Sequence, residues 1–240
     1  MVNYAHRGAS EYAPENTMSA FYLGLLQGAD GIETDIQRTL DGKLVLFHDK
    51  TLERVTVGKA SGCVSDYTLN ELRELKIYGN CATGFYDKIP TLEQFLSVFC
   101  GYKIRFALEL KTPDAEKEVL SLINKYRVVS RVTITSFEYD FIKMVRELCS
   151  YVRIGWLVNG DGLESTSQLS AIKGEEMCPK ASETTEQSVK TLKDSGFCVR
   201  AWGVNNTEQM TRMCRLGVDG MTVNFPDRLC QYLALNNREI

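Results

Sequence analysis

The stretch GIETDIQRTLDGKLVLFHD (residues 31–49) predicts a β-strand, an Asp-Gly turn and a short strand that returns beside the first. Side chains alternate between the two faces of a strand, so Glu33 and Asp35 share one face while Ile32 and Ile36 share the other. A strand with acids on one face and aliphatic side chains on the other suits the wall of a barrel. The two carboxylates are therefore expected to point into the barrel.

The residues before this stretch predict one strand and one helix. Residues 2–6 are a short run that suits a first strand, and PENTMSAFYLGLLQG (14–28) has the pattern of a helix. Asn16 or Thr17 is the expected N-cap and Gly28 the expected stop, because these residue types favour those positions.

Short apolar runs and amphipathic stretches alternate along the rest of the chain, which is typical of repeated βα units. Further strands are expected at 104–111, 131–136, 152–158, 175–179, 197–204 and 217–224. Helices are expected near 91–101, 115–127, 138–149, 164–172, 184–195, 206–216 and 225–235. Eight strands, each followed by a helix, predict an α/β fold of the TIM (β/α)8 barrel type with residues 1–240 as one domain. The fifth and sixth units have the weakest pattern.

Residues 51–90 interrupt the alternation. They contain one short helical pattern, in which Leu69, Leu72 and Leu75 recur at helical spacing. A long segment between a strand and its helix is uncommon unless it is functional or a small subdomain. We expect an insertion subdomain at the barrel mouth, after the second strand and its hairpin.

The composition excludes several classes of protein. The formal net charge is −3, whereas binding to a nucleic-acid backbone needs a basic face. The chain does not open with a charged and then apolar leader, and no apolar stretch approaches the roughly 18 residues that span a bilayer. We expect a cytoplasmic protein with no stable membrane insertion and no nucleic-acid partner. Its eight cysteines are scattered singly and are expected to be reduced thiols: Cys63, Cys81, Cys100, Cys149, Cys178, Cys198, Cys214 and Cys230.

Acids and a lysine fall where a barrel places its chemistry, toward the carboxyl ends of the strands. Glu33 and Asp35 lie on the second strand, and Glu109 and Lys111 repeat the same spacing on the third. Three convergent carboxylates form a hard oxygen-ligand site that suits Mg²⁺ or Ca²⁺. Lys111 is either a ligand for an anion or an internal counter-ion of Glu109.

The two histidines of the chain complete this set. His6 ends the first strand, beside Arg7, and His48 follows the hairpin. Imidazole exchanges protons near neutral pH, and the Arg7 guanidinium matches a phosphate with a planar fork of donors. Metal ligands, cations and two imidazoles together favour phosphodiester cleavage, with one histidine as base and the other as acid.

Several separated motifs, in order, resemble the glycerophosphodiester phosphodiesterase family across nearly the whole chain. They are HRGASEYAPENTMSAF (6–21), GIETDIQRTLDGKLVLFHDKTLERVT (31–56), IPTLEQFL (89–96), FALELK (106–111), SF (136–137), VRAWGVNN (199–206) and GVDGMTVNFPD (217–227). The resemblance implies a TIM barrel with a small insertion, one divalent metal ion and a small-molecule glycerophosphodiester substrate.

The resemblance also implies roles for individual residues. His6 and His48 correspond to the acid/base pair, and Glu33, Asp35 and Glu109 to the metal ligands. Arg7 and Lys111 would contact phosphate, Trp202 would line the mouth near the glycerol, and Glu15 and Asn16 would support the first loop. The chain departs from the family at Asn224, where an aspartate is common, and this amide removes a negative charge.

The family's reaction is attack by a neighbouring glycerol hydroxyl on phosphorus. The alcohol leaves through a cyclic phosphate, which water opens to sn-glycerol 3-phosphate.

Two other functions stay open at this stage. One is a lysophospholipase D-like phosphodiesterase, in which Tyr78, Phe85 and Tyr86 would form an apolar rim for a lipid chain rather than pack within the insertion. The other is a non-catalytic phosphodiester-binding barrel, suggested by Asn224. Trp202 is equally consistent with plain packing.

Overall fold

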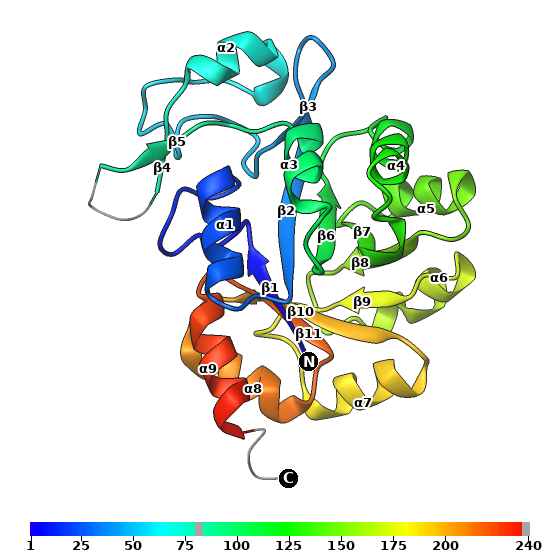
Figure 1. Cartoon of the computed structure of the whole chain (residues 1–240). Helices are drawn as coiled ribbons and strands as arrows, with labels where there is room; N and C mark the ends of the chain where they lie inside the picture. The colour runs from blue at the N-terminus through cyan, green and yellow to red at the C-terminus, as the bar shows by residue number, and fades with distance from the viewer. Residues whose placement is uncertain (80–83, 237–240) are drawn as a thin grey trace.

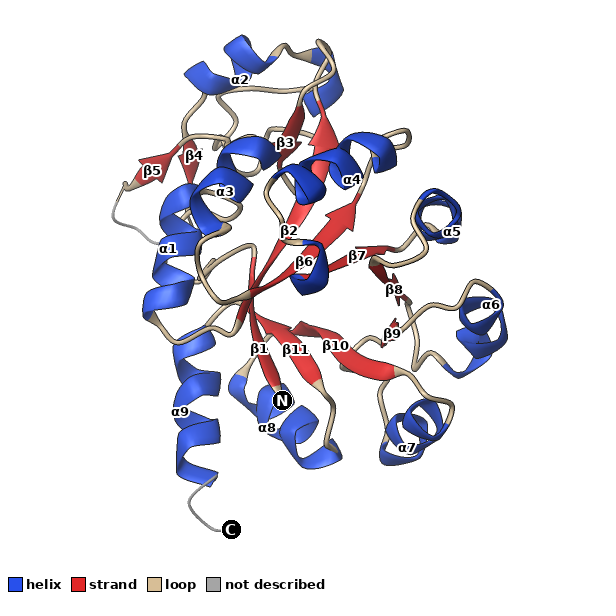
Figure 2. Cartoon of the chain, turned by 45° about the vertical axis from the view of Figure 1, so that its right-hand side comes forward, coloured by secondary structure: helices blue, strands red, loops and turns tan. Residues whose placement is uncertain are grey.

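The eight strands of the barrel come from the whole length of the chain. The structure, a computed structural model, describes residues 1–79 and 84–236. In this part of the chain, eight parallel strands close into a barrel in the order β1, β2, β6, β7, β8, β9, β10, β11 and back to β1 (Figures 1 and 2). They are β1 (Val2–His6), β2 (Gly31–Arg38), β6 (Arg105–Leu110), β7 (Val132–Ser136), β8 (Arg153–Leu157), β9 (Glu176–Cys178), β10 (Cys198–Val204) and β11 (Gly220–Val223).

Helices form the outer layer around these strands (Figure 2). Those of the βα units are α1 (Met18–Leu26), α3 (Leu92–Phe99), α4 (Glu116–Lys125), α5 (Tyr139–Leu148), α6 (Thr166–Ala171), α7 (Glu186–Asp194), α8 (Thr207–Leu216) and α9 (Pro226–Asn236). Their apolar faces meet the outward faces of the strands in one large core. Phe21 of α1, Phe95 and Phe99 of α3, and Phe106 of β6 are fully buried there and pack largely edge to face, as aromatic rings prefer.

The segment after β2 forms a layer of its own at the top of Figure 1. β3 (Leu44–Leu46) returns antiparallel beside β2, and α2 (Leu69–Glu74), β4 (Ile77–Tyr78) and β5 (Tyr86–Asp87) follow. A second hydrophobic cluster lies under this layer and includes Leu52, Val64 and Leu72. Residues 51–90 thus contribute buried apolar side chains that are separate from the main core.

The TIM-barrel prediction is confirmed. The expected strands and helices are present with ends shifted by no more than four residues, and the weak sixth unit has the short strand β9. Helix α1 begins after Thr17, whose hydroxyl accepts a hydrogen bond from the Ala20 N–H, so Thr17 and not Asn16 is the cap. The single helical pattern in 51–90 became α2, while the β4 and β5 pair and a 3₁₀ turn at Val64–Asp66 were not predicted.

The expectations about thiols and membrane spans can also be compared with the structure. Seven cysteines in the described ranges are free, and Cys81 lies outside the described residues. No helix within residues 1–79 and 84–236 is long and apolar enough to cross a bilayer.

Candidate active site

Three carboxylates meet inside the barrel because of strand register. Asp35 of β2 pairs directly with Glu109 of β6, and Glu33 of β2 pairs with His6 of β1. One carboxylate oxygen from each of Glu33, Asp35 and Glu109 lies within 4.8 Å of the other two, and all three side chains are buried. The structure therefore brings together the three ligands that the sequence analysis expected.

Two positively charged side chains, Arg7 and Lys111, lie beside these acids. Arg7 takes a left-handed backbone conformation (φ 57°) just past β1, and its N–H donates to the backbone oxygen and to Oε2 of Glu33. Its Nε lies 3.3 Å from Asp35 Oδ2. Lys111 Nζ lies 2.9 Å from Glu109 Oε1 and 3.4 Å from Asp35 Oδ1. Lys111 thus forms ion pairs with Glu109 and Asp35, as an internal counter-ion would, and it also lines a cavity at the site; its contact with an anion stays a prediction.

The pKa values of the three acids indicate that the charges of Arg7 and Lys111 do not fully neutralise them. Burial, then the Asp35 charge, raises the pKa of Glu33 well above its usual value and that of Glu109 to about 7. Burial opposes ionisation of Asp35 too, but Arg7 and Lys111 outweigh it and hold the pKa of Asp35 low. Asp35 Oδ1 is buried without a hydrogen-bond donor. Hard oxygen donors with unmet negative charge fit a divalent cation.

His6 is hydrogen-bonded by the residue at which the chain departs from the family pattern. Its Nδ1 lies 2.6 Å from Asn224 Oδ1, and its Nε2 lies 3.9 Å from Glu33 Oε2. An amide oxygen only accepts, so Nδ1 carries the proton and Nε2 presents a lone pair. Burial, then the Arg7 charge, lowers the pKa of His6 to about 3. The structure thus places Asn224 against His6, a contact that the sequence analysis did not predict.

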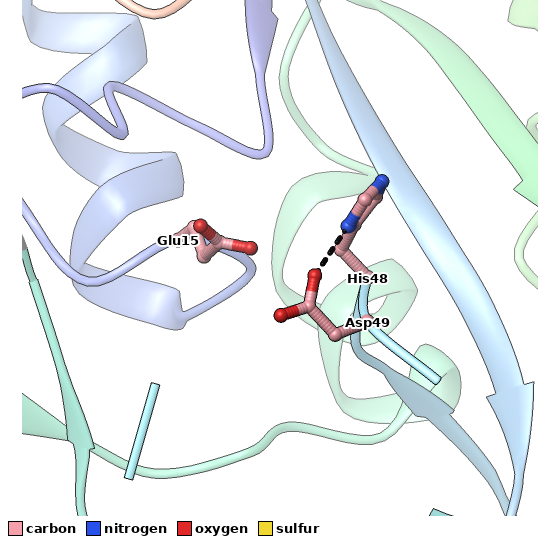
Figure 3. Close-up of side chains that lie close together, drawn as sticks. All are labelled: Glu15, His48 and Asp49. Carbon is pink, nitrogen blue, oxygen red and sulfur yellow. Dashed lines mark hydrogen bonds and ion pairs between the residues drawn. The ribbon is translucent and has the colours of Figure 1, made fainter. Parts of the chain in front are cut away.

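His48 belongs to a separate polar chain (Figure 3). Its Nδ1 lies 2.7 Å from Asp49 Oδ1, and the Glu15 carboxylate points toward this pair. Glu15, His48 and Asp49 have donor atoms close enough to suggest a second metal site. However, the Arg54 guanidinium donates two hydrogen bonds to each carboxylate, at 2.5–2.9 Å. Arg54 therefore supplies the positive charge that a bound metal ion would otherwise provide.

Glu15 and Asn16 connect the first loop to the acids. Glu15 also accepts a hydrogen bond from Arg7, so the two arginines share one carboxylate. Asn16 is buried in a left-handed conformation (φ 56°), where its amide donates to Asp35 at 2.8 Å and accepts from the Thr34 hydroxyl. Asparagine tolerates this conformation better than most residues, so one side chain satisfies both the turn and the acid.

Two cavities in the described part of the chain meet at the site. One of about 280 Å³ is lined by both histidines, Arg7, Glu33, Glu109 and Trp202, with Phe137 and Arg200 among its other walls. A wider one of about 600 Å³ shares His48, Glu109 and Phe137 with it and extends over Lys111 and polar residues of the mouth. Both imidazoles therefore face one space beside the three acids.

Trp202 contributes a wall of the smaller cavity while being fixed by packing. Its indole N–H donates to the Val158 oxygen at 2.9 Å, and its ring meets the Phe137 ring edge to face, with centroids 5.0 Å apart. The two roles considered for Trp202, packing and lining the site, are thus compatible.

The sequence analysis missed Asp49, Arg54, Phe137 and Arg200. All four lie within quoted motifs but received no role there, because their partners come largely from distant parts of the chain. Arg200 is 2% exposed and pairs with buried Glu176 below the site. An arginine between apolar residues in VRAWGVNN (199–206) was a signal that the strand pattern could have used.

Comparisons with known proteins agree with this geometry. The model of the glycerophosphoryl diester phosphodiesterase family matches residues 6–228. A glycerophosphodiester phosphodiesterase of Caldanaerobacter subterraneus subsp. tengcongensis is 32% identical over 233 residues, covering 94% of each chain. One from Bacillus altitudinis is 33% identical over 238 residues, covering 94% of this chain and 95% of its own.

A solved structure shows the same arrangement of the fold. It is an Oleispira antarctica phosphodiesterase in complex with the product sn-glycerol-3-phosphate, with a TM-score of 0.83, 25% identity, and coverage of 98% of this chain and 97% of its own. By the family model and the two relatives of 32% and 33% identity, the chain belongs to the glycerophosphoryl diester phosphodiesterase family.

Proposed function

We propose that the protein hydrolyses glycerophosphodiesters to sn-glycerol 3-phosphate and an alcohol, using two histidines and one divalent cation, Mg²⁺ or Ca²⁺. Membership of the family makes the chain a phosphodiester hydrolase. The observation that carries the finer proposal is the cavity on which His6 and His48 converge beside Glu33, Asp35 and Glu109. The product named for the Oleispira antarctica structure is the one proposed for this chain.

The carboxylates Glu33, Asp35 and Glu109 would hold the cation. When bound, a divalent cation offsets charge on phosphate oxygens and makes a nearby hydroxyl easier to deprotonate. Arg7 lies on the wall of the same cavity and carries a guanidinium that can face a phosphate. Lys111 favours the ionised forms of Glu109 and Asp35, since its charge lowers the pKa of Asp35 and opposes the rise in the pKa of Glu109.

The partners of the two histidines support different roles in the first step. His6 donates from Nδ1 to a neutral amide, so its Nε2 is free to take a proton from the attacking glycerol hydroxyl. His48 lies against the Asp49 carboxylate, which favours an imidazolium and partly offsets the burial that lowers the pKa of His48. We therefore assign the base to His6 and the acid that protonates the departing alkoxide to His48.

The two cavities suit the two halves of a diester. The smaller one holds the histidines and the Trp202 wall and has room for a glycerol unit. The wider one begins at His48 and is lined mostly by polar residues, including Gln37 and Thr51. The glycerol hydroxyl attacks phosphorus, the alcohol leaves on the His48 side, and water then opens the cyclic phosphate.

The same proposal gives residues 51–90 a supporting role within one catalytic domain, residues 1–240. Arg54 of this segment bonds Asp49, which in turn contacts His48. The segment thus reaches the site through hydrogen bonds. A cytoplasmic location, expected from the singly scattered cysteines, is part of the proposal.

Neither alternative function gains support from the geometry. Tyr78 and Tyr86 pack against each other under Lys59 and Lys76, and neither tyrosine lines either cavity at the site. Phe85 lines neither of these two cavities either, so within the described part of the chain the three aromatic residues do not form a rim of the site. Asn224 keeps His6 hydrogen-bonded, so the change from aspartate does not dismantle the acid/base pair.

The proposal is tested by release of glycerol 3-phosphate from glycerophosphocholine, with Mg²⁺ or Ca²⁺ supplied in turn. Turnover of this diester, and much slower choline release from lysophosphatidylcholine, is the expected result. A faster reaction with the lysophospholipid would contradict the assignment of substrate class. Binding without turnover in either metal would favour the non-catalytic barrel.

A further inference from the structure

A basic cavity lies at the end of the barrel opposite the active site. Its volume is about 330 Å³, and it lies where the strands begin, the end marked by the N-terminus in Figure 2. Arg105 and Arg153 are the first residues of β6 and β8, and β7 lies between those strands. The residues that line it are Tyr4, Arg105, Ser130, Arg131, Thr133 and Arg153.

Arg105 and Arg153 are inward-facing residues of the barrel strands. Arg105 is four residues before Glu109 on β6, so strand alternation gives both side chains the same face. Arg153 is likewise on the face of Leu157, which lines the active-site cavity, and Thr133 pairs with Arg153 in register. Three neighbouring strands thus direct two guanidiniums and a hydroxyl toward the barrel axis.

Among the described residues, no carboxylate lines this cavity. Within residues 1–79 and 84–236, the side chains of Arg105 and Arg153 make no ion pair and donate no hydrogen bond. The acids near these strand ends contact other groups instead. Asp30 accepts from the Asn3 N–H, Glu175 pairs with Arg146, and Asp219 pairs with Lys193.

The third arginine adds a fixed positive charge. The Arg131 guanidinium donates to the backbone oxygens of Cys100, Tyr102 and Ile104 and lies over the Phe106 ring. Carbonyl oxygens hold this side chain in place without removing its charge. Three positive charges around one cavity repel one another, and a bound anion would offset this repulsion.

A wall of side chains separates this cavity from the active site. The Tyr4 ring occupies space that glycines at positions 31 and 220 leave open, since a Cβ on Gly31 would lie 2.7 Å from that ring. The buried Arg200 guanidinium lies 5.3 Å from the centre of the same ring and lines the active-site cavity on its other side. Arg200 and Tyr4 thus form the partition.

We propose that the cavity formed by Arg105, Arg131, Arg153, Ser130 and Thr133 is a second anion site, which binds a phosphate dianion as inorganic phosphate or as a phosphate monoester. Guanidinium forks and hydroxyl groups match tetrahedral phosphate oxygens. A volume of about 330 Å³ admits either form. This site is independent of the proposed catalytic function.

The test is calorimetric titration of the full chain with inorganic phosphate and, separately, with glycerol 3-phosphate. It is run with EDTA, where the acids at the mouth carry unmet negative charge and disfavour anions, and repeated with Mg²⁺. Arg105→Gln/Arg153→Gln removes both uncommitted guanidiniums. We expect phosphate to bind the native chain in EDTA and the double variant to bind about tenfold more weakly or worse.

Two controls make the outcome specific. Arg73→Gln/Arg215→Gln removes the same charge from exposed positions outside this cavity and should leave binding unchanged. Arg105→Lys/Arg153→Lys keeps the charge and should retain part of the affinity. kcat/KM should be native in all three variants, because Arg200 and Tyr4 separate the two ends.

Each result then has one meaning. Tighter binding of glycerol 3-phosphate than of inorganic phosphate supports the site with a monoester as its ligand, and equal binding supports it with free phosphate. Absence of binding in EDTA, or equal binding by Arg105→Gln/Arg153→Gln and the native chain, overturns the proposal. An equal loss of affinity in the exposed control would show nonspecific charge attraction and would also overturn it.

Discussion

Replacing Arg54 tests whether the insertion supports catalysis through His48. Arg54 holds Asp49 and Glu15 with four hydrogen bonds, and Asp49 contacts the His48 imidazole. Its side chain does not line either cavity at the site. Arg54→Ala should therefore lower kcat and leave KM near its native value.

The size of the expected effect follows from the solvent exposure of the Arg54 ion pairs. The Arg54 side chain is 47% exposed, so each ion pair contributes about 0.2–1 kcal/mol rather than the larger values of buried pairs. Two bidentate pairs place the loss of stability at roughly 1–2 kcal/mol. If the loss raises the activation free energy of the bound substrate by about 1.4 kcal/mol, kcat falls about tenfold.

The assay compares kcat, KM and urea unfolding for three variants. Arg54→Lys should fall between the native chain and Arg54→Ala, because one ammonium cannot bond two carboxylates bidentately. Arg228→Ala is the matched control, since it removes a similarly exposed arginine that pairs with Glu11. Native kcat in Arg54→Ala, despite lowered stability, would refute the positioning role.

Other predictions concern the histidines and the acids. His6→Ala and His48→Ala should each lower kcat about 100- to 10,000-fold, with native circular dichroism; a native rate in either would remove that residue from the acid/base pair. Asn224→Asp should raise the pKa of His6, since a carboxylate stabilises the imidazolium; if His6 is the base, the acid limb of the kcat/KM profile moves to higher pH, and an unmoved limb would argue against that role. Without metal, Glu109 binds more protons in the native state than in the unfolded state between pH 4.5 and its folded pKa of about 7, so the melting temperature in EDTA should fall as pH rises through this window. Glu109→Gln should flatten that slope, and an equal slope in the variant would show that other groups cause it.

The sequence was enough to predict the barrel because its strands repeat a strong pattern. The alternation of Ile32, Glu33, Thr34, Asp35 and Ile36 fixes which side chains enter the barrel, and register then brings Glu109 beside Asp35. The chain order of the motifs placed both histidines at the correct strand ends. These inferences need local periodicity and one rule about where barrels carry their chemistry.

The residues that were missed depend on contacts between distant segments. Asp49 and Arg54 look like ordinary surface charges until Glu15, far earlier in the chain, is placed beside them. Asn224 acquires its role only when β11 closes against β1 and meets His6. No local pattern encodes such pairs, because each needs the closed barrel.

The most direct test of the account is the rate of glycerol 3-phosphate release from glycerophosphocholine before EDTA, after EDTA, and after Mg²⁺ or Ca²⁺ is restored. Release should stop in EDTA and return with one of the cations, and Glu33→Ala should need far more cation for the same recovery. Undiminished release in EDTA would show that Glu33, Asp35 and Glu109 do not hold a catalytic metal ion.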